Sequence, residues 1–150
     1  DIALLAPGFS GDEDTIAAVG APIKGLRNTA QWAAELDNPA NRKFVEDFKK
    51  TYNRSPSLYA PQGYDAAMLL DSAVRQTGGK LDAEALRPAL RRADFKSVRG
   101  DFKFNRNQYP VQNYYLRVVE ADASGKLSNK LSGTVLTQYQ DPFAAACQMK

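Results

Sequence analysis

The sequence contains no histidine and only one cysteine among its 150 residues. Without histidine, the serine–histidine–aspartate and cysteine–histidine arrangements of hydrolases are excluded, as is any metal site that uses imidazole ligands. Neither a GxxxxGK[S/T] nor a GxGxxG pattern occurs, so a standard loop for nucleotide phosphates is missing as well. We therefore expect a protein that is not an enzyme and that has no cofactor and no metal site.

Long apolar runs and blocks of one charge are also missing. The longest apolar runs are far shorter than the roughly 18 residues of a membrane-spanning helix. Lysine and arginine exceed aspartate and glutamate by 20 to 17, for a net charge of +3. These basic residues are spread along the chain, so nucleic-acid binding is not expected. With 43% hydrophobic and 25% charged residues, the composition is that of a globular protein with a real core.

The first thirty residues predict a strand, a helix and a second strand. Residues 2–6 form an apolar run that is too short for a helix. Asp12 and Asp14 are placed to cap and charge the start of a helix that ends at Gly20, which favours a helix-start role over acid–base chemistry. A second strand is predicted over residues 25–29. This order is typical of an α/β sheet.

The middle of the chain predicts three helices, and the last third predicts strands. Asn38 is a good helix N-cap and is followed by a proline at the first helical position. Two more helices are expected over residues 60–79 and 81–93, where Pro88 marks either a break or the first turn. Asp65 is interpreted as a capping or hinge hydrogen-bond group. After residue 100, apolar alternation separated by turns indicates β-structure.

An aromatic residue stands in the bend GFSG, directly after the first predicted strand. Gly8, Phe9 and Ser10 lie at the carboxyl end of that strand, where open α/β sheets bind ligands. The backbone N–H groups of the bend, near a helix N-terminus, suit an anionic group. Gln31 and Trp32 follow the second strand on the same rim. They predict either the wall of a small-molecule pocket or, in the case of the tryptophan, a lid over the core.

The start of the chain is abrupt, because an apolar strand pattern begins at once without a methionine or a leader. We expect a processed or truncated piece of a longer protein, and a short N-terminal edge strand is the alternative. The single cysteine, Cys147, is either a free thiol or half of a disulfide whose partner lies outside this chain.

Three segments carry a resemblance that extends over essentially all 150 residues. They are NPANRKFVEDFKKTYNRSPS, YAPQGYDAAMLL and RGDFKFNRNQYPVQNYYLRVVE, and LLAPGFSGDED supports them. Together they resemble the C-terminal part of a type I periplasmic binding protein, in the branched-chain amino acid branch of the solute receptors of ABC transporters.

The resemblance implies an α/β fold with two Rossmann-like lobes, of which this chain holds the C-terminal segments. Residues 1–31 would form a strand–helix–strand segment of the second lobe. Residues 32–112 would form a helical segment and a strand of the first lobe, and residues 113–150 the last strands of the second lobe. The hinge positions implied by these crossings are Ala33, Ala34, Pro110 and Gln112.

The implied function is that of an extracytoplasmic solute-binding component of an ABC transporter. Its ligand would be a small carboxylate, either an aromatic or branched-chain aliphatic acid or an amino acid, clamped between the lobes. In amino-acid receptors of the family an acidic residue just after the proline of the first strand can meet the ligand ammonium group. Gly8 or Phe9 stands at that place here, which favours an acid without an amino group. The expected ligand contacts are Gly8, Phe9, Ser10, Gln31 and Trp32.

The family also implies partners and a location. The partners are the small carboxylate and the permease of an ABC transporter, and the location is the periplasm, which tolerates a disulfide at Cys147. A ligand-sensing domain of a receptor or regulator with the same fold is the alternative function. Because sheet edges would be exposed in a partial chain, we also expect a homodimer or a domain-swapped assembly.

Overall fold

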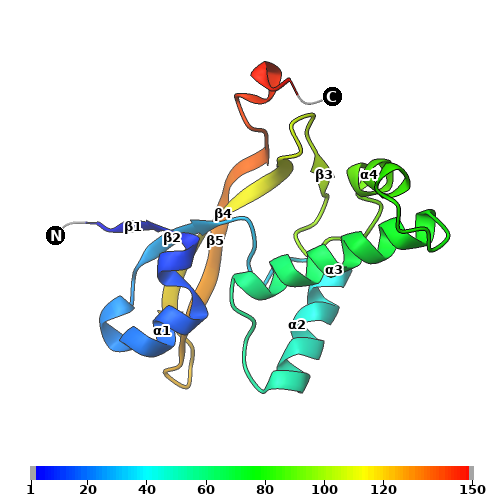
Figure 1. Ribbon diagram of the computed structural model, residues 1–150. Helices are drawn as coiled ribbons and strands as arrows, with labels where there is room; N and C mark the ends of the chain where they lie inside the picture. The colour runs from blue at the N-terminus through cyan, green and yellow to red at the C-terminus, as the bar shows by residue number, and fades with distance from the viewer. Residues whose placement is uncertain (1–2, 149–150) are drawn as a thin grey trace.

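The computed structural model describes residues 3–148, and Figure 1 shows the order of its elements. The helices are α1 (Glu13–Val19), α2 (Pro39–Tyr52), α3 (Tyr59–Gln76) and α4 (Ala83–Arg92). The strands are β1 (Leu5–Pro7), β2 (Arg27–Ala30), β3 (Lys103–Phe104), β4 (Pro110–Ala121) and β5 (Leu127–Tyr139). Short 3-10 turns lie at Gly8–Gly11, Ala21–Ile23 and Ala144–Ala146.

The sheet has the order β1-β2-β4-β3, and β5 also pairs with β4. β1 runs parallel to β2, as the predicted strand–helix–strand unit requires, whereas β2, β3 and β5 run antiparallel to β4. Residue 2 of the predicted first strand lies outside the described residues. The α/β fold expected from the sequence is confirmed.

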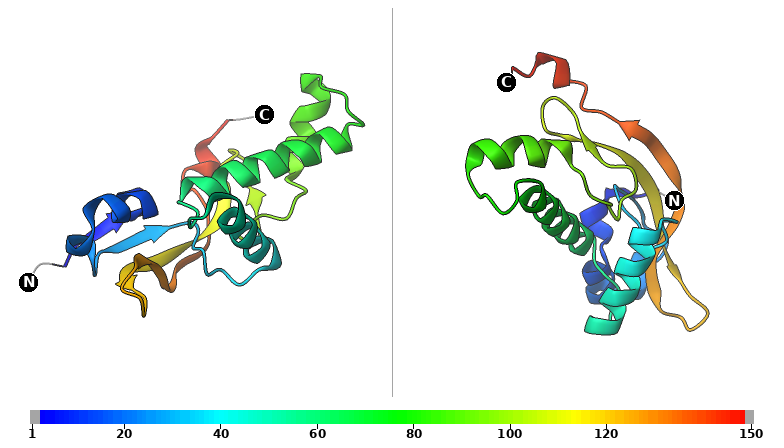
Figure 2. Two further views of the ribbon diagram at one scale, coloured as in Figure 1. Left: turned by 90° about the horizontal axis from the view of Figure 1, so that it is seen from below. Right: turned by 90° about the vertical axis from the view of Figure 1, so that its right-hand side faces the viewer.

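β4 changes partners along its length. Its first residues pair with β3, where Pro110 lies opposite Phe104. From Gln112 onward it pairs with β5, and the register shifts between Gln112 and Tyr115 and again between Leu116 and Arg117. Figures 1 and 2 show β4 and β5 as a long curved ribbon, with α1 beside β1 and β2 and the helices α2 to α4 grouped together.

The predicted helix start at Asn38 is confirmed, because its side-chain oxygen accepts a hydrogen bond of 2.8 Å from the backbone N–H of Asn41. Asn53, in the left-handed conformation with φ 51°, ends α2. Asp82 caps α4 in the same way through the N–H of Ala85. Pro88 lies inside α4, so it marks neither a break nor the first turn.

The main core joins the end of β2 to the helices. Ala30, Trp32 and Phe44 belong to one buried cluster with Tyr115 of β4. A smaller cluster under α1 contains Ile16, Ile23 and Val119. The main core therefore contains residues from both sides of the lobe boundaries expected at residues 31–32 and 112–113, and those boundaries stay a prediction.

Candidate functional site

The turn Gly8–Gly11 presents Phe9 and Ser10 to solvent at the end of β1. The Phe9 side chain is 59% exposed, an unusual position for a phenyl ring directly after a strand. The flanking glycines are buried. Phe9 is thus an exposed aromatic group on a turn whose two ends are packed against the protein.

Close packing explains both glycines of this turn. A Cβ atom on Gly8 would lie 2.8 Å from the Cβ of Ala30, and one on Gly11 would lie 2.8 Å from the side-chain nitrogen of Asn28. The φ angle of each glycine lies outside the left-handed region. The glycines are therefore required because β2 passes directly behind the turn, and a sharp backbone bend is not the reason.

A chain of buried and partly buried hydrogen bonds lies behind the turn. Arg117 of β4 donates from Nε to Asn28 Oδ1 over 2.9 Å and from Nη2 to the Gly8 carbonyl over 3.1 Å. Asn28 Nδ2 donates to Asn129 Oδ1 over 2.8 Å, and Asn129 Nδ2 donates to the Gly11 carbonyl over 2.6 Å. Residues from β2, β4 and β5 thus hold the first and last carbonyl groups of the turn.

Of the two acids expected at the start of α1, Asp14 lies in its first turn, whereas Asp12 does not act as the sequence suggested. Asp12 is buried and its Oδ1 accepts a hydrogen bond of 2.6 Å from the N–H of Leu58, so its side chain does not cap α1. Glu13 accepts one of 3.0 Å from the N–H of Asn129, and burial raises the pKa of Glu13. Burial lowers the pKa of Arg117, an effect that the negative charges of Asp12 and Glu13 oppose.

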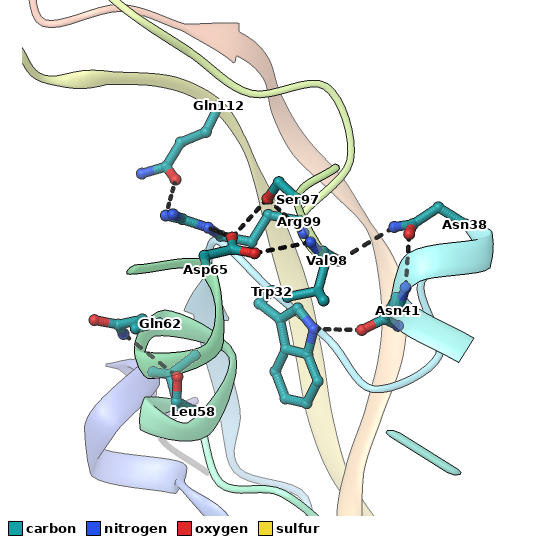
Figure 3. A network of polar contacts seen from close by, with 10 residues as sticks. All are labelled: Trp32, Asn38, Asn41, Leu58, Gln62, Asp65, Ser97, Val98, Arg99 and Gln112. Carbon is teal, nitrogen blue, oxygen red and sulfur yellow. Dashed lines mark hydrogen bonds and ion pairs between the residues drawn. The ribbon is translucent and has the colours of Figure 1, made fainter. Parts of the chain in front are cut away.

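Trp32 lies in the core, where it presents no surface to a ligand. Its side chain is 2% exposed, its Nε1 donates to Asn41 Oδ1 over 2.7 Å, and its ring meets Phe44 edge to face. The chain turns inward after β2, which directs the indole toward α2 (Figure 3). The lid interpretation of Trp32 is therefore correct and its assignment to the pocket wall is wrong. Gln31 is half-buried.

Asn41 holds the segment that follows β2. Its Nδ2 lies 3.4, 3.1 and 3.1 Å from the carbonyl oxygens of Ala33, Ala34 and Leu36. Ala33 and Ala34 are the residues of the first expected hinge crossing. Asn41 was not predicted as a functional residue. The signal that could have indicated it is a polar amide on the same face of α2 as the apolar Phe44.

Asp65 connects α3 to the second expected crossing. Its carboxylate accepts hydrogen bonds from Ser97 Oγ (2.6 Å), the N–H of Val98 (3.0 Å) and Arg99 Nε (2.9 Å). Arg99 Nη1 in turn donates to Gln112 Oε1 over 2.9 Å, as Figure 3 shows. Asp65 lies inside α3, so it is not a helix cap but the centre of a buried network.

The remaining predicted site residues lie apart from the turn. Pro110 is half-buried at the start of β4. Cys147 is half-buried, and within residues 3–148 it has no disulfide partner. The same part of the chain has no group of three or more metal-ligating His, Cys, Asp or Glu side chains, and no helix there is long and apolar enough to cross a membrane.

Residues 1–126 match the protein family described as "Periplasmic binding protein". The chain belongs to this family. A curated relative, "Leu/Ile/Val-binding protein homolog 6" of Brucella abortus, is 33% identical over 132 residues, which make up 86% of this chain. The chain spans 34% of the length of that relative.

Solved structures agree with this assignment. A solute-binding protein of an ABC transporter from R. palustris, in complex with benzoate, is 36% identical with a TM-score of 0.80 over 98% of this chain and 39% of that chain. Another from Rhodopseudomonas palustris BisB5, in complex with 3,4-dihydroxybenzoic acid, is 29% identical with a TM-score of 0.81 over 92% of this chain and 38% of that chain. The resemblance to type I periplasmic binding proteins of the branched-chain amino acid group is confirmed.

Proposed function

We propose that this chain is part of an extracytoplasmic solute-binding component of an ABC transporter, and that the whole protein binds a small aromatic or branched-chain aliphatic carboxylate. The observation that carries the proposal is the 59% exposed Phe9 on a turn with buried ends. Support comes from the relatives, whose names include a Leu/Ile/Val-binding homologue and solute-binding proteins in complex with benzoate and 3,4-dihydroxybenzoic acid.

The chemistry of the turn favours an acid without an amino group. A phenyl ring offers stacking and desolvation to an aromatic or aliphatic body. The Ser10 hydroxyl offers a hydrogen bond beside it. Positions 8 and 9 carry no acidic side chain that would meet an ammonium group. Gly8 contributes by letting the turn approach β2, and the half-buried Gln31 stays a proposed contact.

Closure of two lobes about a hinge would trap the ligand. We place the crossings at Ala33–Ala34 and at Pro110–Gln112, with residues 32–112 in the first lobe. The change of partner along β4 and its register shifts after Gln112 support the second crossing. The proposed partner is the permease of the transporter, in the periplasm.

Self-association of the 150-residue chain is a further part of this proposal. β1 pairs only with β2 within the described chain, and Leu4 and Leu5 beside that edge are 69% and 68% exposed. Such an edge can pair with a second copy. Light scattering of the isolated chain should give a dimer, and a stable monomer would contradict this part.

Thermal shift on the whole protein tests the function. Benzoate should raise the melting temperature by several degrees at concentrations well above its dissociation constant. Phe9→Ala should weaken binding about tenfold or more, since burial of an aromatic ring contributes about 1.5–3 kcal/mol. Phe143→Ala is the matched control, because Phe143 is also exposed, at 76%, but lies beyond β5. No shift with benzoate or with branched-chain acids would overturn the proposal.

A further inference from the structure

Arg117 holds the turn that carries Phe9, although the two residues are far apart in the sequence. We propose that Arg117 is a positioning residue for ligand binding, which fixes the orientation of Phe9 through the backbone of the turn, with Asn28 and Asn129 as its relay. This inference rests on the proposed function, because it assumes that Phe9 contacts the ligand.

Hydrogen bonds connect Arg117 to both ends of the turn. Arg117 reaches the carbonyl of Gly8 directly, and it reaches the carbonyl of Gly11 through Asn28 and Asn129. These carbonyls lie at the two ends of the turn, on either side of Phe9 and Ser10. Since both ends are fixed to the sheet, the turn cannot rotate as a unit without breaking this chain of hydrogen bonds.

Arg117 and Asn28, which form the centre of this network, are buried. Arg117 is 2% exposed and Asn28 is 0% exposed. Burying a guanidinium group is unfavourable unless its hydrogen bonds are made, and a paired carboxylate is the usual compensation. Within residues 3–148, the ion pairs do not include Arg117. Its hydrogen bonds go to neutral oxygens, and one of these belongs to the turn itself.

An arginine side chain suits position 117 better than a lysine side chain. Its planar fork can donate to two acceptors in different directions, here the Asn28 side chain and the Gly8 carbonyl. Lysine carries the same charge but lacks this fork. The side chain of Phe9 is largely in solvent, so its direction depends on the backbone of the turn. A turn held in its binding conformation before the ligand arrives loses less conformational entropy on binding.

A double-mutant cycle with benzoate on the whole protein tests this inference. Arg117→Lys should weaken benzoate binding about tenfold when Phe9 is present. In the Phe9→Ala background the same change should weaken binding less than about twofold, because the positioned ring is gone. Equal effects in both backgrounds would overturn the proposal, since they would mean that Arg117 acts independently of Phe9.

Arg99→Lys is the matched control for this cycle. Arg99 is also a largely buried arginine, but it pairs with Asp65 in the helical part of the molecule. Its effect on benzoate affinity should be the same whether position 9 is phenylalanine or alanine. Coupling of Arg99 to Phe9 as strong as that of Arg117 would contradict a specific role for Arg117.

A second measurement needs no ligand. Chymotrypsin cleaves after phenylalanine, so the rate of cleavage after Phe9 reports how often the turn leaves its folded conformation. Arg117→Lys and Asn129→Ala should each raise this rate about tenfold, relative to cleavage after the exposed Phe143. If Arg117→Lys does not fold, Asn129→Ala replaces it in both the binding and the cleavage experiment.

Unchanged cleavage in a folded variant would overturn the positioning role. A wild-type protein that fails to bind benzoate would instead count against the proposed function, while the cleavage rates would still decide the positioning role.

Discussion

Arg99 and Arg117 are both largely buried arginines, and they are held in different ways. Arg99 makes an ion pair of 2.9 Å with Asp65, whose carboxylate also binds Ser97 and the N–H of Val98. Arg117 donates to a neutral amide and to the backbone of an exposed turn. The first arrangement joins α3 to the start of β4, whereas the second holds an exposed candidate binding element. The buried arginine that is paired with a carboxylate thus connects elements of the fold, and the one without an ion pair contacts the turn that carries Phe9.

The largest expected effect is that of Asp65→Ala. It would leave the Arg99 guanidinium without its buried partner and would remove the acceptor for Ser97 and Val98. Loss of one member of a buried ion pair destabilises a protein by about 3–5 kcal/mol. Urea denaturation measures the free energy of unfolding. Asp71→Ala is the control, because Asp71 pairs with Arg75 on the exposed surface of α3 and should cost less than about 0.5 kcal/mol.

Arg117→Met should lower the free energy of unfolding by an intermediate amount. Methionine removes the charge that opposes those of Asp12 and Glu13, and it leaves the acceptor oxygens of Asn28 and Gly8 without their buried donor. Leaving such buried groups unsatisfied costs about 1–3 kcal/mol. The same urea titration should therefore place Arg117→Met below Asp65→Ala. A larger loss of unfolding free energy for Arg117→Met than for Asp65→Ala would contradict the difference between the two networks.

The smallest expected effect is the pH dependence of Glu13→Gln. Burial raises the pKa of Glu13 above its ordinary value of 4.5. Above that value the unfolded chain loses the proton before the folded chain does, so the stability of the wild type falls as the pH rises through this window. Glutamine does not ionise. The stability of Glu13→Gln relative to wild type should therefore grow as the pH rises above about 4.5.

Thermal unfolding across this pH range measures the difference, and Asp14→Asn serves as the control. Asp14 is next to Glu13 but exposed, with an ion pair to Arg54. A stability difference for Glu13→Gln that shrinks with rising pH would contradict the burial of the Glu13 carboxylate.

Local patterns predicted much of the fold. The strand–helix–strand unit, the cap at Asn38 and the position of Phe9 on a turn follow from residues that are close together in the sequence. Resemblance to a family then supplied the overall architecture. These features depend on propensity, capping and periodicity, which operate within a few residues.

The networks could not be predicted in the same way, because their partners are far apart. Arg117 and Gly8 are 109 residues apart, and Asp65 and Arg99 are 34 residues apart. One signal was present, since strand alternation places Arg117 on the same face as the buried Tyr115 and Val119. The direction of Trp32 depended on how the chain turns after β2, which no local pattern determines.

Calorimetric titration of the whole protein with benzoate, comparing wild type with Phe9→Ala and Phe143→Ala, tests the central claim most directly. Phe9→Ala should raise the dissociation constant about tenfold or more, because the ring is expected to stack on the ligand, and Phe143→Ala should leave it within about twofold. Equal dissociation constants for wild type and Phe9→Ala would contradict the claim that the turn contacts the ligand.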